Sequence, residues 1–269
     1  MLFAFDLDKT IVRNDYDLPR EITAAIGRVK EAGHLVTVLT GRPHVAALTY
    51  LEQLGVLEHY STNHGAHVTG KGGEILHRRR IDKAHVAELL ADYVEHPEVE
   101  FSCVVDDVLY VKNPEDERWA WAHTLNRSLE KFHPGLDLHA DKIVFTADGL
   151  SASIRERVAE RYPDFVMYPW EEGYLEVTGA QADKGTALEL LAGELGVHQN
   201  EVVAFGDGPN DVTMLEWAGY SVAVGPHAHP DVIAAADEHI DSPEELGVAR
   251  WLEENVLTAG KALAFAGAK

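Results

Sequence analysis

Short apolar runs recur along the chain, separated by longer segments of mixed character. Such runs of aliphatic, β-branched and aromatic residues are typical of strands buried on both faces of a sheet. These runs are Leu2–Phe5, Leu35–Leu39, Val202–Phe205 and Val222–Val224. We therefore expect each run to form a strand of one sheet, with side chains packed above and below it.

The segments between these runs carry apolar residues three or four positions apart, which indicates helices with one buried face. Pro19 and Pro43 stand where two of these helices begin, and Gly33 and Gly55 stand where they end. Proline at the start and glycine after the end are the usual punctuation of a helix. Another helix begins at about Lys184. The alternation of strand and helix predicts a parallel sheet with helical crossovers.

The middle of the chain follows a different pattern. Phe101–Val105 and Leu109–Val111 flank two acids, Asp106 and Asp107, which predicts a hairpin with the acids in its turn. Further strands alternate with helices after this hairpin. These strands are Ile143–Thr146, Phe165–Tyr168 and Tyr174–Val177. The pattern predicts an α+β module built on an antiparallel sheet.

The two patterns divide the chain into an outer and an inner part. We expect residues 1–80 and 179–269 to form one α/β domain with a doubly wound, Rossmann-like parallel sheet. Residues 81–178 are then a second, α+β domain inserted between the two halves of the first.

The charge of the chain limits its partners. The formal net charge is −22 over 269 residues, and such a surface repels nucleic acids and anionic membranes. The same field repels a phosphorylated small molecule unless its binding site carries cations. We therefore expect no nucleic-acid or membrane partner, and a local positive site if the substrate is a phosphate ester.

The chain has one cysteine, Cys103, so no disulfide forms within it, which fits a reducing compartment. Its apolar neighbours predict a buried position in a strand. No apolar stretch approaches the ~20 residues that span a bilayer, and the N-terminus has no basic, signal-type segment. We expect a cytoplasmic protein, either a monomer or a homodimer.

Polar residues follow three of the predicted strands at the points where they end. Because the carboxyl ends of parallel strands meet at one edge of a sheet, these side chains are expected to converge there. They are Asp6 and Asp8 after the first strand, Thr40 and Arg42 after the second, and Asp207, Asn210 and Asp211 after the third. Together with Lys184 and the helix N-termini at the same edge, they would form a cationic pocket with carboxylates for a divalent ion.

Each of these motifs also has an ordinary structural explanation when taken alone. Asp6 and Asp8 can cap a turn, and Thr40–Pro43 can be a strand-to-helix turn with proline at the first helical position. Lys184 can be a solvated lysine, and Gly206–Asp211 can be a turn rich in Asp and Asn. The chemical interpretation therefore depends on the motifs coming together in space.

In chain order, the motifs resemble the four motifs of the haloacid dehalogenase superfamily of phosphatases. The matching stretches are Asp6–Thr10, Thr40–Arg42, Lys184 and Gly206–Asp211. The insertion between the second and third motifs resembles the Cof-type branch. Its members have a large α/β cap and act mainly on small phosphorylated metabolites.

The resemblance implies catalytic and metal-binding roles. It implies that Asp6 attacks phosphorus and forms an aspartyl-phosphate, and that Asp8 protonates the leaving alcohol and later accepts a proton from water. It also implies a Mg²⁺ ion held by Asp6, the backbone carbonyl of Asp8 and Asp207, with Asp211 supporting them.

The resemblance also implies residues that bind the phosphate. Thr40, Lys184 and the backbone at Gly41 would bind the phosphoryl oxygens, and Asn210 would orient Lys184 or the metal ligands. Arg42 has two open interpretations, a contact with the phosphate or leaving group and an ion pair at the surface.

Two positions depart from the Cof-type pattern. Lys9 stands where glycine is usual, which places an extra cation beside Asp6. The stretch Asn63–Ala66 has one residue more than the usual Asn-Gly-Ala, which leaves the role of Asn63 open.

Two further groups of residues each have a functional and a structural interpretation. Candidates for substrate selection, or for a surface loop, are Trp170, Glu171, Glu172 and Tyr174, and candidates for a metal, or for a solvated loop, are His227 and His229.

We expect a Mg²⁺-dependent phosphatase that hydrolyses small phosphorylated metabolites, sugar phosphates first among them, through an aspartyl-phosphate. One alternative is a phosphosugar mutase on the same fold, which returns the phosphoryl group to the sugar. Another is a non-enzymatic phospho-acceptor module. In such receivers the phosphorylated aspartate follows a central strand, whereas Asp6 follows the first strand, and receivers have no large insertion.

Overall fold

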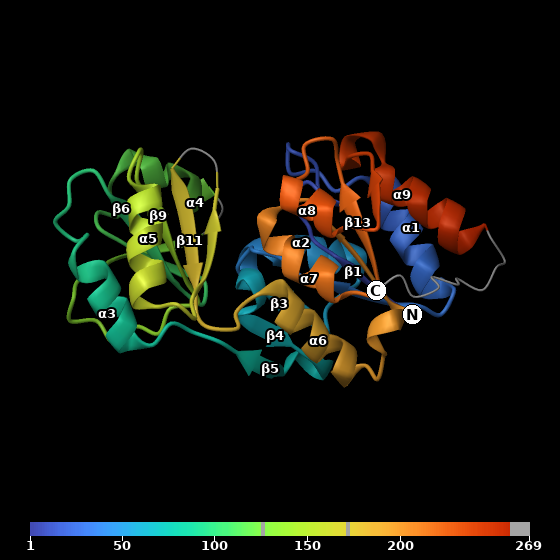
Figure 1. Cartoon of the computed structure of the whole chain (residues 1–269), viewed down its shortest axis with the longest axis horizontal. Coiled ribbons are helices and arrows are strands. Elements are labelled where there is room, and N and C mark those ends of the chain that lie inside the picture. Colours follow the sequence, from blue (N-terminus) through green and yellow to red (C-terminus); the bar gives the residue numbers. More distant parts are fainter. Residues whose placement is uncertain (125–126, 171–172, 259–269) are drawn as a thin grey trace.

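A computed structural model describes residues 1–124, 127–170 and 173–258 of the chain. The fold is α/β, with a doubly wound parallel sheet and an inserted α+β cap domain. Figure 1 shows the two parts as separate lobes, joined by two crossing segments.

The first lobe contains a parallel sheet of five strands in the order β14-β13-β12-β1-β2. Strand β1 lies inside the sheet and pairs in parallel with β12 on one side and β2 on the other. The strands are β1 (Leu2–Phe5), β2 (Leu35–Val38), β12 (Val202–Gly206), β13 (Tyr220–Val224) and β14 (Glu238–Ile240). The predicted parallel sheet is therefore confirmed, and the motif-bearing strands are adjacent in it.

Helices cover both faces of this sheet because alternate residues of each strand point to opposite sides. Phe3 and Phe5 join one apolar cluster, while Leu2 and Ala4 join another on the opposite face. The first face is covered by α1 (Arg20–Glu31), α2 (His44–Leu54) and α9 (Gly247–Leu252). The second is covered by α6 (Lys184–Glu194), α7 (Val212–Trp217) and α8 (Pro230–Ala235).

A small antiparallel sheet lies beside the parallel one and was not predicted. Its strands, in spatial order, are β3 (Tyr60–Thr62), β4 (His67–Thr69) and β5 (Ile75–Arg78). These strands are short and rich in Thr, Ser and His, so they lack the apolar runs that mark the other strands. Val68 of β4 packs in the same apolar cluster as Leu188 of α6.

The second lobe contains a sheet of six strands in the order β10-β11-β9-β6-β7-β8. Its strands are β6 (Glu100–Val105), β7 (Val108–Val111), β8 (Ser128–Lys131), β9 (Lys142–Thr146), β10 (Val166–Pro169) and β11 (Tyr174–Thr178). Helices α3 (Lys83–Ala91) and α5 (Ser151–Arg161) supply residues to its main apolar cluster. A smaller cluster lies under the short helix α4 (Ala120–Thr124).

The hairpin around Asp106 is confirmed. β6 and β7 pair antiparallel, and Asp106 takes the left-handed backbone conformation that such a turn requires. The antiparallel sheet expected for this module is present, with one parallel pair, between β7 and β8. β8 is a polar edge strand, and such strands give no apolar signal.

Two expectations from composition have structural counterparts. Cys103 lies buried in β6, and burial raises the pKa of its thiol to about 12, so it behaves as an apolar residue. Within the described part of the chain, none of the helices combines the length and the apolar character needed to cross a bilayer.

Candidate active site

The predicted motifs meet at one edge of the parallel sheet. Asp6 follows β1, and its backbone N–H donates to the carbonyl of Phe205 in β12 at 3.0 Å. The hydroxyl of Thr10 donates to the Asp207 carboxylate at 3.2 Å. Because β1 and β12 are neighbours in register, motifs separated by about two hundred positions in the sequence are joined by direct hydrogen bonds.

Lys184 links two of the carboxylates. Its Nζ donates to Asp6 and to Asp211, in each case at 2.5 Å, and its side chain is fully buried. It lies at the first position of α6, which begins where the Asp183 side chain accepts from the N–H of Thr186. Burial by itself lowers the pKa of Lys184, but the two carboxylates outweigh it and the net shift is upward. Lys184 is therefore a charged ammonium at neutral pH.

Three carboxylates form the acidic part of the site. Oxygen atoms of Asp6, Asp207 and Asp211 lie within 4.8 Å of one another. Asp211 is held in place because it accepts from the N–H groups of Asp207 and Gly208, at 3.0 and 2.9 Å. One lysine faces three acids here, so negative charge is in excess in a buried space.

Burial and the neighbouring negative charges raise the pKa of two of these acids. Burial raises the pKa of Asp6 well above its ordinary value, although Lys184 opposes the shift. Burial and the neighbouring Asp211 raise the pKa of Asp207 to about 7. A cation with oxygen ligands would remove this imbalance, and carboxylates are the ligands that Mg²⁺ and Ca²⁺ take in proteins. The residues present therefore fit a divalent cation.

Asp8 stands apart from the carboxylate cluster because Arg42 binds it. The guanidinium donates through Nε and Nη2 to the two Asp8 oxygens, at 2.8 and 2.5 Å. The same guanidinium lies over the rings of Tyr50 and Tyr16, with 4.7 and 5.4 Å to their centroids. Of the two interpretations of Arg42, the structure shows the ion pair, with Asp8 as partner. The metal ligand that Asp8 is predicted to supply is its backbone carbonyl oxygen, which takes no part in this ion pair.

Thr40 and Gly41 are placed by β3 and by the segment that follows it. The N–H of Thr40 donates to the carbonyl of Ser61, and the carbonyl of Thr40 accepts from the N–H of His64, both at 3.0 Å. A Cβ at Gly41 would lie 2.3 Å from the His64 ring. Only glycine fits at this position, because the buried ring fills the space of any side chain.

His64 is the functional candidate that the sequence did not reveal. It is buried, with its ring 4.7 Å from that of Tyr168 in β10. Its Nε2 contacts the Glu176 carboxylate in β11, and its Nδ1 accepts from the Asn210 amide at 3.1 Å. The extra residue between Asn63 and Gly65 was the only signal for it. Its neighbours come from the other lobe and from the fourth motif, which no local pattern identifies.

Lys142 of β9 completes this network. Its Nζ donates to Glu176 at 2.9 Å and to the Gly41 carbonyl at 3.0 Å. Burial opposes ionisation of Glu176, but Lys142 and His64 outweigh it and lower the pKa of Glu176. The Asn210 amide, expected to orient Lys184 or the metal ligands, donates to His64. The network therefore joins the second and fourth motifs to the inserted sheet.

Lys9 takes a left-handed backbone conformation, with φ of 59°. Glycine adopts this conformation at little cost, which explains why glycine is usual at this position. The Lys9 side chain is exposed, and its charge is one of the influences that lower the pKa of Asp207.

The remaining candidates fall in different places. Trp170 lies against the fourth motif, since a Cβ at Gly208 would be 3.5 Å from its indole ring. Tyr174 is exposed. Glu171 and Glu172 lie outside the described residues. His227 is exposed and His229 accepts from the N–H of Asp231 at the start of α8, so neither joins a cluster of metal-ligand type among the described residues.

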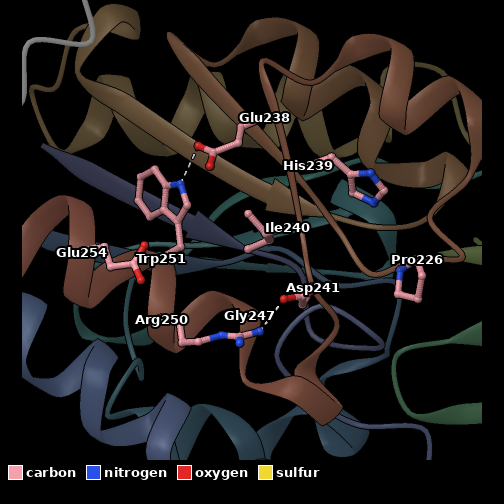
Figure 2. Close-up of a pocket in the computed structure, with 9 residues that line it drawn as sticks. All are labelled: Pro226, Glu238, His239, Ile240, Asp241, Gly247, Arg250, Trp251 and Glu254. Carbon is pink, nitrogen blue, oxygen red and sulfur yellow. Dashed lines mark hydrogen bonds and ion pairs between the residues drawn. The ribbon is translucent and has the colours of Figure 1, made fainter.

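A cavity of about 450 Å³ lies away from these motifs, between β14 and α9. Figure 2 shows Arg250 paired with Asp241 and the Trp251 indole donating to Glu238 in this cavity. None of the predicted catalytic or metal-binding residues lines it. The size of a cavity therefore does not locate the chemistry in this protein.

Comparison with known proteins identifies the family. Residues 3–252 match the sequence model of haloacid dehalogenase-like hydrolases. The chain is 29% identical to the putative phosphatase YxeH of Bacillus subtilis, over 95% of this chain and 98% of the relative. It is 27% identical to the 5-amino-6-(5-phospho-D-ribitylamino)uracil phosphatase YitU of the same organism, over 94% and 96% of the two chains.

Solved structures agree with this assignment at the level of the fold. The chain is similar to the structure of the HAD subclass IIB sugar phosphatase BT4131, with a TM-score of 0.81, 22% identity, and coverage of 94% of this chain and 98% of the other. The chain thus belongs to the haloacid dehalogenase-like hydrolases, as a Cof-type phosphatase that hydrolyses phosphoric monoesters.

Proposed function

We propose that this enzyme is a Mg²⁺-dependent phosphatase that hydrolyses small phosphorylated metabolites, sugar phosphates first among them, through an aspartyl-phosphate on Asp6. The observation that carries the proposal is the buried Lys184, which contacts Asp6 and Asp211 at 2.5 Å each. A buried lysine between carboxylates at a sheet edge is well suited to bind a transferring phosphoryl group.

In the first step, an oxygen of Asp6 attacks phosphorus while the bond from phosphorus to the leaving oxygen breaks. Lys184 and Thr40 would hold the equatorial oxygens of the phosphoryl group, with the backbone at Gly41. Mg²⁺ bound by Asp6, Asp207, Asp211 and the carbonyl of Asp8 would neutralise the charge that gathers on these oxygens. The product is an aspartyl-phosphate and a free alcohol.

Asp8 would transfer the protons. It donates one to the leaving oxygen in the first step and takes one from the attacking water in the second, so it returns to its initial state. The attack of water releases inorganic phosphate and restores Asp6. Both Asp8 oxygens accept from Arg42 in this structure, so one of them would have to leave the guanidinium and take up a proton before Asp8 acts as the acid. The contact that remains would still orient the carboxyl group, which is 42% exposed.

The division into domains belongs to the same proposal. Residues 1–80 and 179–269 would form the catalytic domain, and residues 81–178 a cap that closes over the substrate. The hydrogen bonds from Lys142 to Gly41 and between His64 and Glu176 support closure directly above the second motif. A closed cap excludes bulk water while phosphorus is transferred.

The polyol character of the substrate has support from one relative. YitU, 27% identical to this chain, is named for a phosphate ester on a ribityl chain. The test is phosphate release across phosphorylated sugars, polyols and nucleotides, with and without Mg²⁺. We expect activity that is lost in Asp6→Asn while the circular dichroism spectrum is unchanged. Wild-type activity in Asp6→Asn, or conversion of a hexose 1-phosphate into its 6-phosphate isomer, would contradict the proposal.

A further inference from the structure

Arg42 contacts more than the Asp8 carboxylate. Its guanidinium lies over two tyrosine rings, 4.7 Å from the centroid of Tyr50 and 5.4 Å from that of Tyr16. Its Nη1 also donates to the carbonyl of Ala46 at 3.4 Å. The hydrogen bonds to Asp8 need an acceptor oxygen, whereas the attraction of a cation to an aromatic ring needs only the face of the ring. The rings can therefore hold the guanidinium independently of Asp8.

The two tyrosines differ in their surroundings. Tyr50 lies in α2, is buried, and belongs to the apolar cluster on that face of the parallel sheet. Tyr16 lies in the segment between β1 and α1 and is 69% exposed. A ring as exposed as this contributes little to stability through burial. Burial of its ring is therefore not what keeps Tyr16 beside Arg42.

Hydrogen bonds of the backbone keep Tyr16 in place. Its φ of 65° is left-handed, which costs free energy for a residue other than glycine. Its carbonyl accepts from the Tyr50 hydroxyl at 2.9 Å, and its N–H donates to the carbonyl of Arg13 at 3.0 Å. The N–H of Arg13 donates to the carbonyl of Asp17 at 2.8 Å, which closes the turn. Strain of this kind persists where the surroundings enforce it, and it gathers at functional sites.

The proton transfer expected of Asp8 gives these contacts a use. To carry a proton, one Asp8 oxygen has to leave Arg42, so the ion pair loses one of its two hydrogen bonds just before Asp8 acts as the acid. Burial opposes the charge of Arg42, but Asp8 outweighs it and raises the pKa of the guanidinium. Because arginine stays charged in proteins, its attraction to the two rings persists when Asp8 is protonated.

We propose that Tyr16 is a positioning residue for the acid step, which together with Tyr50 holds the Arg42 guanidinium in place while Asp8 exchanges its proton. This inference rests on the proposed function and adds a residue that lies outside the four motifs. In the acid step, the bond from phosphorus to the leaving oxygen breaks, its electron pair stays on that oxygen, and the Asp8 proton moves to it. The hydrogen bond that remains between Arg42 and Asp8 aims the carboxyl group. A displacement of about 1 Å at such a step is costly.

The experiment compares two leaving groups that differ in their need for a proton. The alcohol of a sugar or polyol phosphate has to be protonated as it leaves, whereas 2,4-dinitrophenol leaves as a stable anion. The measured quantity is the rate of alcohol or phenol release in a single turnover, with saturating enzyme and Mg²⁺. This rate excludes substrate binding and the later hydrolysis of the aspartyl-phosphate. The alkyl substrate is the sugar or polyol phosphate that the wild type hydrolyses fastest.

The variants remove or keep the ring of Tyr16. Tyr16→Asn removes the ring, and asparagine tolerates the positive φ, so we expect it to fold. It should slow release of the alkyl alcohol about tenfold, a part of the about 10²–10⁴-fold that a positioned acid contributes, and change release of dinitrophenol less than about twofold. Tyr16→Phe keeps the ring and should restore release of the alkyl alcohol to the wild-type rate. Asp8→Asn should show the same selectivity with a larger loss.

Three outcomes would overturn the inference. Equal slowing of both substrates in Tyr16→Asn would indicate damage to the site as a whole, and unchanged release of the alkyl alcohol would show that the ring has no part in the acid step. Slowing in Tyr16→Phe as large as in Tyr16→Asn would show that the aromatic face is not what matters. If the wild type released neither alcohol nor phenol, the proposed function itself would fail, and the inference with it.

Discussion

Lowering the pH of the metal-free enzyme from about 8 to about 6 should stabilise its fold. Burial, and then the Asp211 carboxylate, raise the pKa of Asp207 from its ordinary value of 3.8 to about 7. The folded protein therefore binds a proton at Asp207 in a range where the unfolded chain does not. The stability from this proton is fully present below pH 3.8 and is lost as the pH rises through about 7.

The size of this effect follows from the same shift. Between about pH 8 and pH 6, Asp207 of the folded protein goes from mostly ionised to mostly protonated, while in the unfolded chain it stays ionised. The difference in unfolding free energy is about 1.4 kcal/mol. Asp6, whose pKa is also raised by burial, acts in the same direction.

The assay is urea denaturation in EDTA at both pH values, on the wild type and on Asp207→Asn. The asparagine variant keeps the shape and cannot titrate, so the wild type should gain about 1.4 kcal/mol more than the variant. Saturating Mg²⁺ should abolish this difference, since a bound cation keeps the carboxylate ionised. Parallel behaviour of the two proteins in EDTA, or a difference that Mg²⁺ leaves intact, would refute the reasoning.

Four further outcomes are expected. Lys184→Met should lower the unfolding free energy by about 3–5 kcal/mol, because it leaves buried carboxylates without their cation, and it should abolish phosphate release. A loss of less than about 1 kcal/mol in urea denaturation would contradict this expectation. Lys9→Gly should raise the unfolding free energy by about 0.5–1 kcal/mol by relieving the left-handed strain, and an unchanged or lower value would show that Lys9 is not strained. Arg42→Lys should lower kcat more than it raises KM, since a single ammonium cannot make the bidentate contact with Asp8; an unchanged kcat would remove this positioning role. In His64→Asn, asparagine tolerates the positive φ but the contact with the cap is lost, so the cap should be open at least about tenfold more often. The expected observation is a larger radius of gyration in X-ray scattering. An unchanged radius would contradict the role of this contact.

The sequence by itself determined the parallel sheet and the meeting of the motifs. Strands such as Leu2–Phe5 are buried on both faces, and an uninterrupted apolar run in the sequence predicts this burial. Once such strands are parallel, their carboxyl ends share one edge, so Asp6, Thr40 and Asp207 had to come together. The order of the strands in the sheet, with β1 between β12 and β2, makes these residues neighbours along that edge.

Only the tertiary structure decided the contacts made across the two lobes. His64 binds Glu176, and Lys142 binds Gly41, at separations of about a hundred residues. The periodicity of the sequence does not indicate such a pair, because the partner of a buried polar group is whichever group the fold brings near it. The Asn63 amide has no hydrogen-bond partner among the described residues, and no local pattern indicates this either. Local patterns report which face of an element is buried, whereas hydrogen bonding in the interior depends on the packed arrangement as a whole.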